Sequence, residues 1–354
     1  MEYFTSVSKH PVFSKTVKEI FYDATLHDER MMEPERYKLA YKLKYHDFDE
    51  AAYQRGLDQC RKMLVDQQAI LDNKEDVAVI KAGLDLMPKV KRVSIFDSSK
   101  DSCVRPWYDD EGPGSWDGSL PNYPPIWTSY EKDSEQDGSS ETYGNGWDPR
   151  IFNNLFCAIS LSDTTIYDLV LGAKQQKDLC TVPFTLCQFR RDELLHACNV
   201  FWPLTKLSIR FNTDDSGLED IRWLVDWLKE ARSLTDLTLE FLPTLYEDVF
   251  HYLWQMSPWP NLRSLEISHM WCDQDGLAGF LRSHTLEMVC VKAIHLLAPG
   301  SWEEVAENLS FDKASLSYLG AEDNGGFYTL SNEEHTKLER CMLRSKPAEK
   351  ATVW

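Results

Sequence analysis

The sequence lacks any long apolar run, which excludes several classes of protein. Its most apolar later segment, VCVKAIHLLA at 289–298, is short and carries Lys292 and His295, so it cannot span a bilayer. The opening MEYFTSVSKHPVFSK has no apolar core of the kind a signal peptide needs. Basic residues are also few: 38 Lys and Arg stand against 57 Asp and Glu, a net charge of −19 with no basic run to contact phosphates. We therefore expect no membrane or nucleic-acid partner, and a cytoplasmic or nuclear location.

Motifs of catalysis and metal binding are missing as well. The patterns G-x-S-x-G, G-x-x-x-x-G-K-[ST] and H-E-x-x-H do not occur. The segment DSEQDG from Asp133 begins like a calcium loop, but its twelfth position is Gly144, where that loop needs a bidentate Glu. Nine cysteines are scattered without C-x-x-C spacing, which is typical of thiols in a reducing compartment. We predict no catalytic residue, no metal and no cofactor, and a protein that is not an enzyme.

What the sequence does contain is one recurring phrase, L-x-x-L-x-L, in which any aliphatic residue is allowed. Clear copies start at Leu204, Leu234, Leu262 and Leu286, and a weaker one is placed at Leu316/Leu319/Ala321. Looser copies stand upstream at Val17/Ile20/Tyr22, Val90/Val93/Ile95 and Ile166/Leu169/Leu171. The last two aliphatic residues of a copy alternate with polar residues, which places both on one face of a short strand.

Helical periodicity fills the intervals between the copies. LEDIRWLVDWLKEAR at 218–232 carries an apolar stripe, and 246–256, 273–284 and 301–309 repeat the theme, the last with Ser301 and Glu304 spaced as a capping box. A strand–helix unit buries both apolar faces only by stacking on its neighbours. The sequence thus predicts an α/β fold, an irregular leucine-rich-repeat-like solenoid of strand–helix units. The alternative is an ordinary α/β domain whose parallel strands look alike.

The chain divides into four parts by composition. Residues 1–97 form a helical N-terminal section with the first repeat-like strands. Residues 98–150 are an acidic insertion rich in Gly, Pro and Trp that we expect to be flexible. Residues 151–330 hold the leucine-rich-repeat-like solenoid, and 331–354 a C-terminal helix and tail.

Strand residues that alternate with the aliphatic positions point away from the core. In a solenoid they line up across neighbouring units into one surface, which suits protein recognition and is otherwise a plain solvated face. Because their charges are mixed in sign, they do not indicate a particular kind of partner. The candidate partner-binding residues are Lys206, Ser208, Arg210, Asp236, Thr238, Glu240, Arg263, Glu266, Ser268, Glu287 and Lys292, with Cys290 beside them.

Three segments follow one another in a telling order: VSKHPVFSKTVKEIFYDATLHDE at 7–29, LMPKVKRVSIFD at 86–97, and TLEMVCVKAIHLLAPGSWEEVAENL at 285–309. An acidic insertion and degenerate repeats stand between the last two. This order resembles large families of filamentous-fungal F-box proteins over most of the chain. The resemblance implies leucine-rich repeats that present a substrate protein to a cullin-RING ubiquitin ligase.

The same families open on an F-box, the helical module that docks on the Skp1 adaptor. Nothing before Val7 matches that module, so docking on Skp1 through it is not expected. The leading hypothesis is a non-catalytic protein-interaction module resembling the substrate-recognition region of an F-box receptor. The alternatives are a hydrolase-type enzyme using loop carboxylates such as Asp109/Asp110 or Asp214/Asp215 on a carbohydrate-like ligand, and a decayed paralogue with no selected activity.

Overall fold

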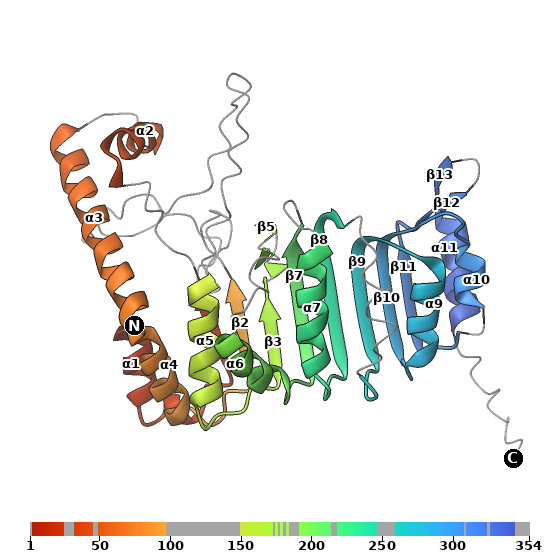
Figure 1. Cartoon of the computed structure of the whole chain (residues 1–354), viewed down its shortest axis with the longest axis horizontal. Helices are drawn as coiled ribbons and strands as arrows, with labels where there is room; N and C mark the ends of the chain where they lie inside the picture. Colours follow the sequence, from red (N-terminus) through yellow and green to blue (C-terminus); the bar gives the residue numbers. More distant parts are fainter. Residues whose placement is uncertain are drawn as a thin grey trace, which may run out of the picture. The chain divides into compact units, whose positions relative to one another are not determined.

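A computed structural model of the chain shows a mixed α/β fold with an open sheet of mainly parallel strands (Figure 1). The chain forms two compact units, residues 1–165 with 171–182 (unit 1) and residues 166–170 with 183–354 (unit 2). The structure describes residues 2–24, 32–44, 49–96, 149–172, 174–175, 178–179, 182–183, 191–213, 218–245, 259–307, 309–323 and 326–343. The expected helix at 246–256 and nearly all of the expected insertion at 98–150 lie outside these residues.

Unit 1 is mainly helical. Its strands β1 and β2 are parallel and pair Ile20 with Val93 and Tyr22 with Ile95, so two of the looser phrase copies lie in register. The elements are α1 (Glu2–Lys9), η1 (Phe13–Lys15), β1 (Glu19–Asp23), α2 (Pro34–Lys44), α3 (Glu50–Asn73), α4 (Glu75–Leu86), β2 (Arg92–Phe96), α5 (Pro149–Leu161), β4 (Lys174–Gln175) and β5 (Asp178–Leu179).

The long helix α3 follows from its sequence. Asp49 caps its first turn by accepting hydrogen bonds from two backbone N–H groups, and apolar residues recur along one side. Lys74, at φ 53°, ends α3 in the left-handed conformation and leads directly into α4. Tyr37 of α2 packs on Tyr53 of α3 with ring centroids 5.7 Å apart. The buried stripe consists of Tyr53, Leu57, Cys60, Leu64 and Leu71.

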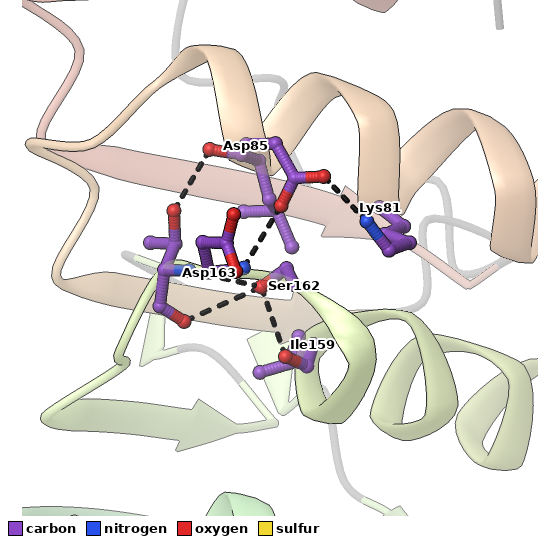
Figure 2. Close-up of polar contacts among 7 residues, drawn as sticks. Lys81, Asp85, Ile159, Ser162 and Asp163 are labelled. Carbon is purple, nitrogen blue, oxygen red and sulfur yellow. Dashed lines mark hydrogen bonds and ion pairs between the residues drawn. The ribbon is translucent and has the colours of Figure 1, made fainter.

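Polar contacts join α4 to α5 at two levels. In the buried part, Asn154 Nδ2 donates to both carboxylate oxygens of Asp76, at 3.1 and 2.9 Å. At the C-terminal end of α4, Asp85 accepts from Lys81 Nζ at 2.6 Å and from the backbone N–H of Asp163 at 2.9 Å (Figure 2). Thr164 donates its hydroxyl to the carbonyl of Leu84 at 2.8 Å. These bonds satisfy backbone groups at helix ends and fix how the two helices meet.

Unit 2 carries most of the sheet, with neighbouring strands that follow the order of the sequence. The order is β3, β7, β8, β9, β10; β11 and β12 both pair with β10, and β13 runs antiparallel to β12. The elements are β3 (Asp168–Leu171), β6 (Val182–Pro183), α6 (Arg191–Phe201), β7 (Lys206–Asn212), α7 (Leu218–Glu230), β8 (Asp236–Leu245), β9 (Ser264–Cys272), α9 (Gln274–Ser283), β10 (Met288–Leu296), α10 (Trp302–Ala306), β11 (Lys313–Ser317), β12 (Gly320–Asp323), β13 (Gly326–Thr329) and α11 (Asn332–Met342).

The core of unit 2 lies between the sheet and the helices α6, α7 and α9, which cover one face of it (Figure 1). The aliphatic positions of the phrase align in register across β7, β8, β9 and β10 and are buried. Two buried indoles add cross-links between elements: Trp259 donates to the carbonyl of Leu228 at 2.9 Å and Trp302 to that of Gly320 at 2.8 Å. A buried indole N–H needs such a partner.

A single hydrogen-bond arrangement recurs where each strand begins. The carbonyl of Thr205 accepts from the N–H groups of Thr235 and Asp236, at 2.8 and 3.0 Å. Each acceptor is the residue directly after the first aliphatic position of a phrase copy. The other cases are Lys18 with Lys91 and Arg92, Tyr167 with Thr205 and Lys206, Thr235 with Arg263 and Ser264, Arg263 with Glu287 and Met288, and Glu287 with Asp312 and Lys313.

The fifth copy of the phrase lies elsewhere than the sequence analysis places it. In the register, Ala314 pairs with Val289 and Leu316 pairs with Val291, so Leu316 is the last aliphatic position of a copy and Phe311 the first. Phe311 is buried but aromatic, and Ala314 is the smallest aliphatic residue, so neither position stands out in the pattern. The aromatic and the small residue hid this copy, which starts 25 residues after Leu286 (311 − 286) rather than 30.

The caps of α10 and α11 differ although both begin with Ser-x-x-Glu. Ser331 and Glu334 form the full reciprocal capping box. Ser301 accepts from the backbone N–H of Glu304 at 3.3 Å, but Gln274 of α9 accepts from the backbone N–H of Ser301 at 2.6 Å. The expected capping box at Ser301 is therefore half formed, because a neighbouring helix supplies the second partner.

Helix α11 supplies partners for backbone N–H groups of β11 and of the residues that follow it. Glu339 Oε1 accepts from the backbone N–H of Leu316 at 2.7 Å, and His335 Nε2 accepts from that of Leu319 at 3.1 Å. Side chains thus occupy N–H groups that an exposed edge would offer to another chain.

Candidate functional site

The candidate site is the side of the unit 2 sheet opposite α6, α7 and α9, which we call the strand face. The register sets its side chains in three rows that cross the strands from β7 to β11. The first row is Lys206, Asp236, Ser264, Met288 and Lys313; the second is Ser208, Thr238, Glu266, Cys290 and Ser315; the third is Arg210, Glu240, Ser268, Lys292 and Ser317. Nine of the eleven candidate residues fall in these rows.

Arg263 and Glu287 are the two that do not. Each lies one residue before its strand, and their side chains form an exposed ion pair with Arg263 Nη1 2.7 Å from Glu287 Oε1. The positions that complete the first row are Ser264 and Met288. The sequence already indicated Ser264 and Met288 for this row, because each stands directly before the second aliphatic residue of a copy, as Lys206 and Asp236 do.

On β7 and β8 the charges of the strand face pair with one another. Lys206 Nζ lies 3.6 Å from Asp236 Oδ1, with both side chains substantially exposed. Arg210 donates from Nε and Nη2 to Glu240 Oε2, at 2.8 and 2.6 Å. The Arg210 side chain is 4% exposed and that of Glu240 15%. A partner protein can therefore contact Lys206 and Asp236 directly, but it cannot reach Arg210.

Arg210 is also incompletely satisfied. Its Nη1 is buried and has no hydrogen-bond partner among the described residues. Leaving a buried charged donor unpaired lowers the net benefit of the ion pair. Ser268, which stands next to Glu240 in the third row, is buried as well. Charge reversal at Arg210 or Glu240 would thus test the stability of the sheet before it tested binding.

On β9, β10 and β11 the charges of the strand face are not paired in this way. Glu266, Lys292 and Lys313 are exposed and form no ion pair with any residue that the structure describes. Met288, in the first row, is 42% exposed, and Tyr318, directly after the third row, is 66% exposed. This part of the face offers uncommitted cations beside apolar surface.

The same part of the sheet has an unusual backbone. His269, Ala293 and Tyr318 have φ of 61°, 50° and 53°, although none is glycine. All three directly follow the third row, since Ser268, Lys292 and Ser317 are register partners. After this left-handed residue the pairing of β9 and β10 resumes with Met270 and Ile294, both buried. The aligned bulges keep apolar residues inward on both sides of the bend.

Two histidines lie where these strands bend. Burial lowers the pKa of His269, which also feels Glu240, Lys292 and Arg210. Burial likewise lowers the pKa of His295, which His269 lowers further. The His295 ring lies 5.3 Å from that of Trp271, its register partner.

Metal-ligand clusters, disulfides and membrane-spanning helices are each absent from the described ranges. These ranges contain no group of His, Cys, Asp or Glu able to hold a metal ion, and their cysteines form no disulfide. No helix among them is both long and apolar enough to cross a membrane. The carboxylate pairs considered for hydrolysis, Asp109/Asp110 and Asp214/Asp215, and the calcium-like segment from Asp133 lie outside the described residues.

No model of a known protein family and no curated protein sequence matches this chain.

Proposed function

We propose that the strand face binds another protein, and that the strand–helix units of this chain form a leucine-rich-repeat-like array that displays it. The observation that carries the proposal is the register: polar side chains of successive units stand in straight rows on the face opposite the helices. A broad polar face of this kind suits protein recognition, whereas a small-molecule site needs a concave pocket.

The repeated start of each strand supports the array. The same doubly accepting carbonyl occurs after the first aliphatic residue of successive phrase copies, from Tyr167 to Glu287. Left-handed residues recur at His269, Ala293 and Tyr318, which are 24 and 25 residues apart (293 − 269 and 318 − 293). Local geometry that returns with the sequence phrase is typical of stacked repeat units.

Within this proposal, the chain acts as a substrate-recognition module of the kind the F-box resemblance implies, without catalysis of its own. Its binding energy would come from exposed residues such as Glu266, Lys292 and Lys313. The acidic composition of the rest of the chain disfavours nucleic acid as the partner.

The test is an unbiased selection. A phage-displayed peptide library is selected on the immobilised full chain, and each binder is measured by biolayer interferometry against Glu266→Arg and against Asp275→Arg. Asp275 lies in the first turn of α9, on the helical side, and is exposed. Both variants make the same change of charge. We expect the affinity of the binders to change with Glu266→Arg alone, and binders that respond only to Asp275→Arg would overturn the proposal.

A further inference from the structure

The geometry points to an extended, acidic segment of a partner protein as the ligand of the strand face at β10 and β11. We propose that its carboxylates contact Lys292 and Lys313 and that its apolar side chains contact Met288 and Tyr318. These four residues are called the β10–β11 patch. The inference rests on the proposed function and adds the chemistry of the partner.

The charges of the patch favour an anionic ligand. On β7 and β8 each lysine or arginine of the strand face has a carboxylate partner, at 3.6 Å for Lys206 and 2.6 Å for Arg210. Lys292 and Lys313 have no such partner in the described part of the chain, and both are exposed. Glu266 is the exposed carboxylate of the neighbouring strand, so the rows of β9 to β11 carry a net charge of +1 (two Lys, one Glu) within a chain of −19.

The apolar residues of the patch favour an amphipathic ligand. Met288 is the register partner of Lys313, and Tyr318 directly follows Ser317, the register partner of Lys292. Met288 therefore stands beside Lys313, and Tyr318 directly follows the residue opposite Lys292. Tyr318 is 66% exposed although a tyrosine ring gains by burial, which is a property of binding residues at protein interfaces.

The spacing of the patch favours an extended protein segment. Adjacent strands lie about 4.8 Å apart and alternate side chains of one strand about 6.7 Å apart. The side chains on one side of an extended segment stand at the same interval, so acidic and apolar residues that share that side can meet the lysines and the apolar residues of the patch. Aligned left-handed residues at Ala293 and Tyr318 fix the end of this surface.

The experiment uses fluorescence anisotropy with the full chain at low ionic strength. The probe is a labelled peptide of Glu-Ser-Leu-Ser repeats, in which Glu and Leu share one side of the extended chain. Two counterparts carry Gln in place of Glu, or Ser in place of Leu, and an oligothymidine of equal charge serves as a non-protein anion. We expect the Glu/Leu peptide to bind tightest, with an affinity that falls as salt is added.

Variants locate the binding. Lys292→Gln and Lys313→Gln should each weaken the Glu/Leu peptide about fivefold, as expected for loss of one exposed charge contact. Lys62→Gln, the same change at an exposed position of α3 in unit 1, should leave the affinity unchanged. Tyr318→Asn keeps a residue that tolerates positive φ and should also weaken binding about fivefold. Circular dichroism confirms that each variant is folded.

Three results would overturn the inference. They are equal binding of the Gln/Leu and Glu/Leu peptides, an equal effect of Lys62→Gln and Lys292→Gln, and oligothymidine binding at least as tight as the Glu/Leu peptide. The library selection separates this failure from failure of the proposed function. Selected binders that depend on Glu266 but carry no acidic residues would retain the strand face as a binding surface and remove its acidic ligand.

Discussion

The two halves of the strand face solve the same structural problem differently. On β7 and β8, opposite charges face one another across adjacent strands, and pairing continues beyond the third row through Phe211 and Phe241. On β9 to β11 the charges stay separate and the strands bend at a left-handed residue. We call β7 and β8 the closed half, because their charged side chains pair with one another. We call β9 to β11 the open half, because their charged side chains stay unpaired among the described residues and their left-handed residues add strain without an evident gain in stability. Such a half is where we place function.

The largest expected effect breaks the closed half. Glu240→Gln removes the countercharge of buried Arg210 and should lower the free energy of unfolding by about 3–5 kcal/mol. Urea denaturation followed by tryptophan fluorescence measures it. The double variant Arg210→Met/Glu240→Met should recover most of the loss, because no unpaired charge then remains buried. A double variant no more stable than Glu240→Gln would show that the two residues do not act as a pair.

The second prediction concerns how the stability of the protein depends on pH through its buried histidines, two of which belong to the open half. Burial lowers the pKa of His269, His284 and His295 below the value of 6.5 that the unfolded chain retains. The native state then binds fewer protons than the unfolded chain below about pH 6.5. Stability should therefore be constant above this pH and fall as the pH decreases through it.

Urea midpoints between pH 8 and pH 5 measure this slope. His269→Asn keeps a residue that accepts positive φ, and His295→Gln keeps a polar group of similar size. Both variants should flatten the decline. A slope unchanged in both variants would contradict the assignment to buried imidazoles.

A third prediction addresses the backbone of the open half. Ala293→Gly should raise the free energy of unfolding by about 0.5–1 kcal/mol, since glycine relieves the left-handed strain at φ 50° but loses more entropy on folding. Ala314→Gly makes the same change in β11, where no such strain is present, and should lower it by about 0.5–1 kcal/mol. Thermal denaturation of both variants reports the sign, and equal signs would remove the strain argument.

The smallest effect belongs to the exposed pair of the closed half. A double-mutant cycle with Lys206→Ala and Asp236→Ala should give a coupling of about 0.2–1 kcal/mol that disappears in 1 M salt. Comparison with the Arg210–Glu240 pair, four residues further along the same strands (210 − 206), isolates the contribution of burial. A coupling at Lys206 as large as that at Arg210 would remove the distinction between the two pairs.

Much of the fold could be predicted because the apolar pattern is strong. The copies at Leu204, Leu234, Leu262 and Leu286 became adjacent parallel strands in register, and 273–284 became α9 with Asp273 as its cap. The copy at Phe311 was misplaced because Ala314 weakens its pattern. Helices α5 and α6 were not anticipated, since no phrase copy marks them.

The candidate site could be predicted only in part. Alternation places a side chain on the strand face, but it carries no information on burial by neighbours. Arg210 and Glu266 look equivalent in the sequence, yet one is buried in an ion pair and the other is exposed. The importance of Lys313 and Tyr318 emerged only when the register showed which residues stand beside Met288 and Lys292.

The sequence by itself determined the strand–helix alternation and the inward face of each strand, because both are local consequences of apolar spacing. Only the tertiary structure decided which charges pair, where the strands bend and which residues remain exposed. These properties depend on side chains that lie 24 to 31 residues apart in the chain, such as Arg263 with Glu287 and Trp259 with Leu228. Their proximity is set by the register between strands, which no local pattern encodes.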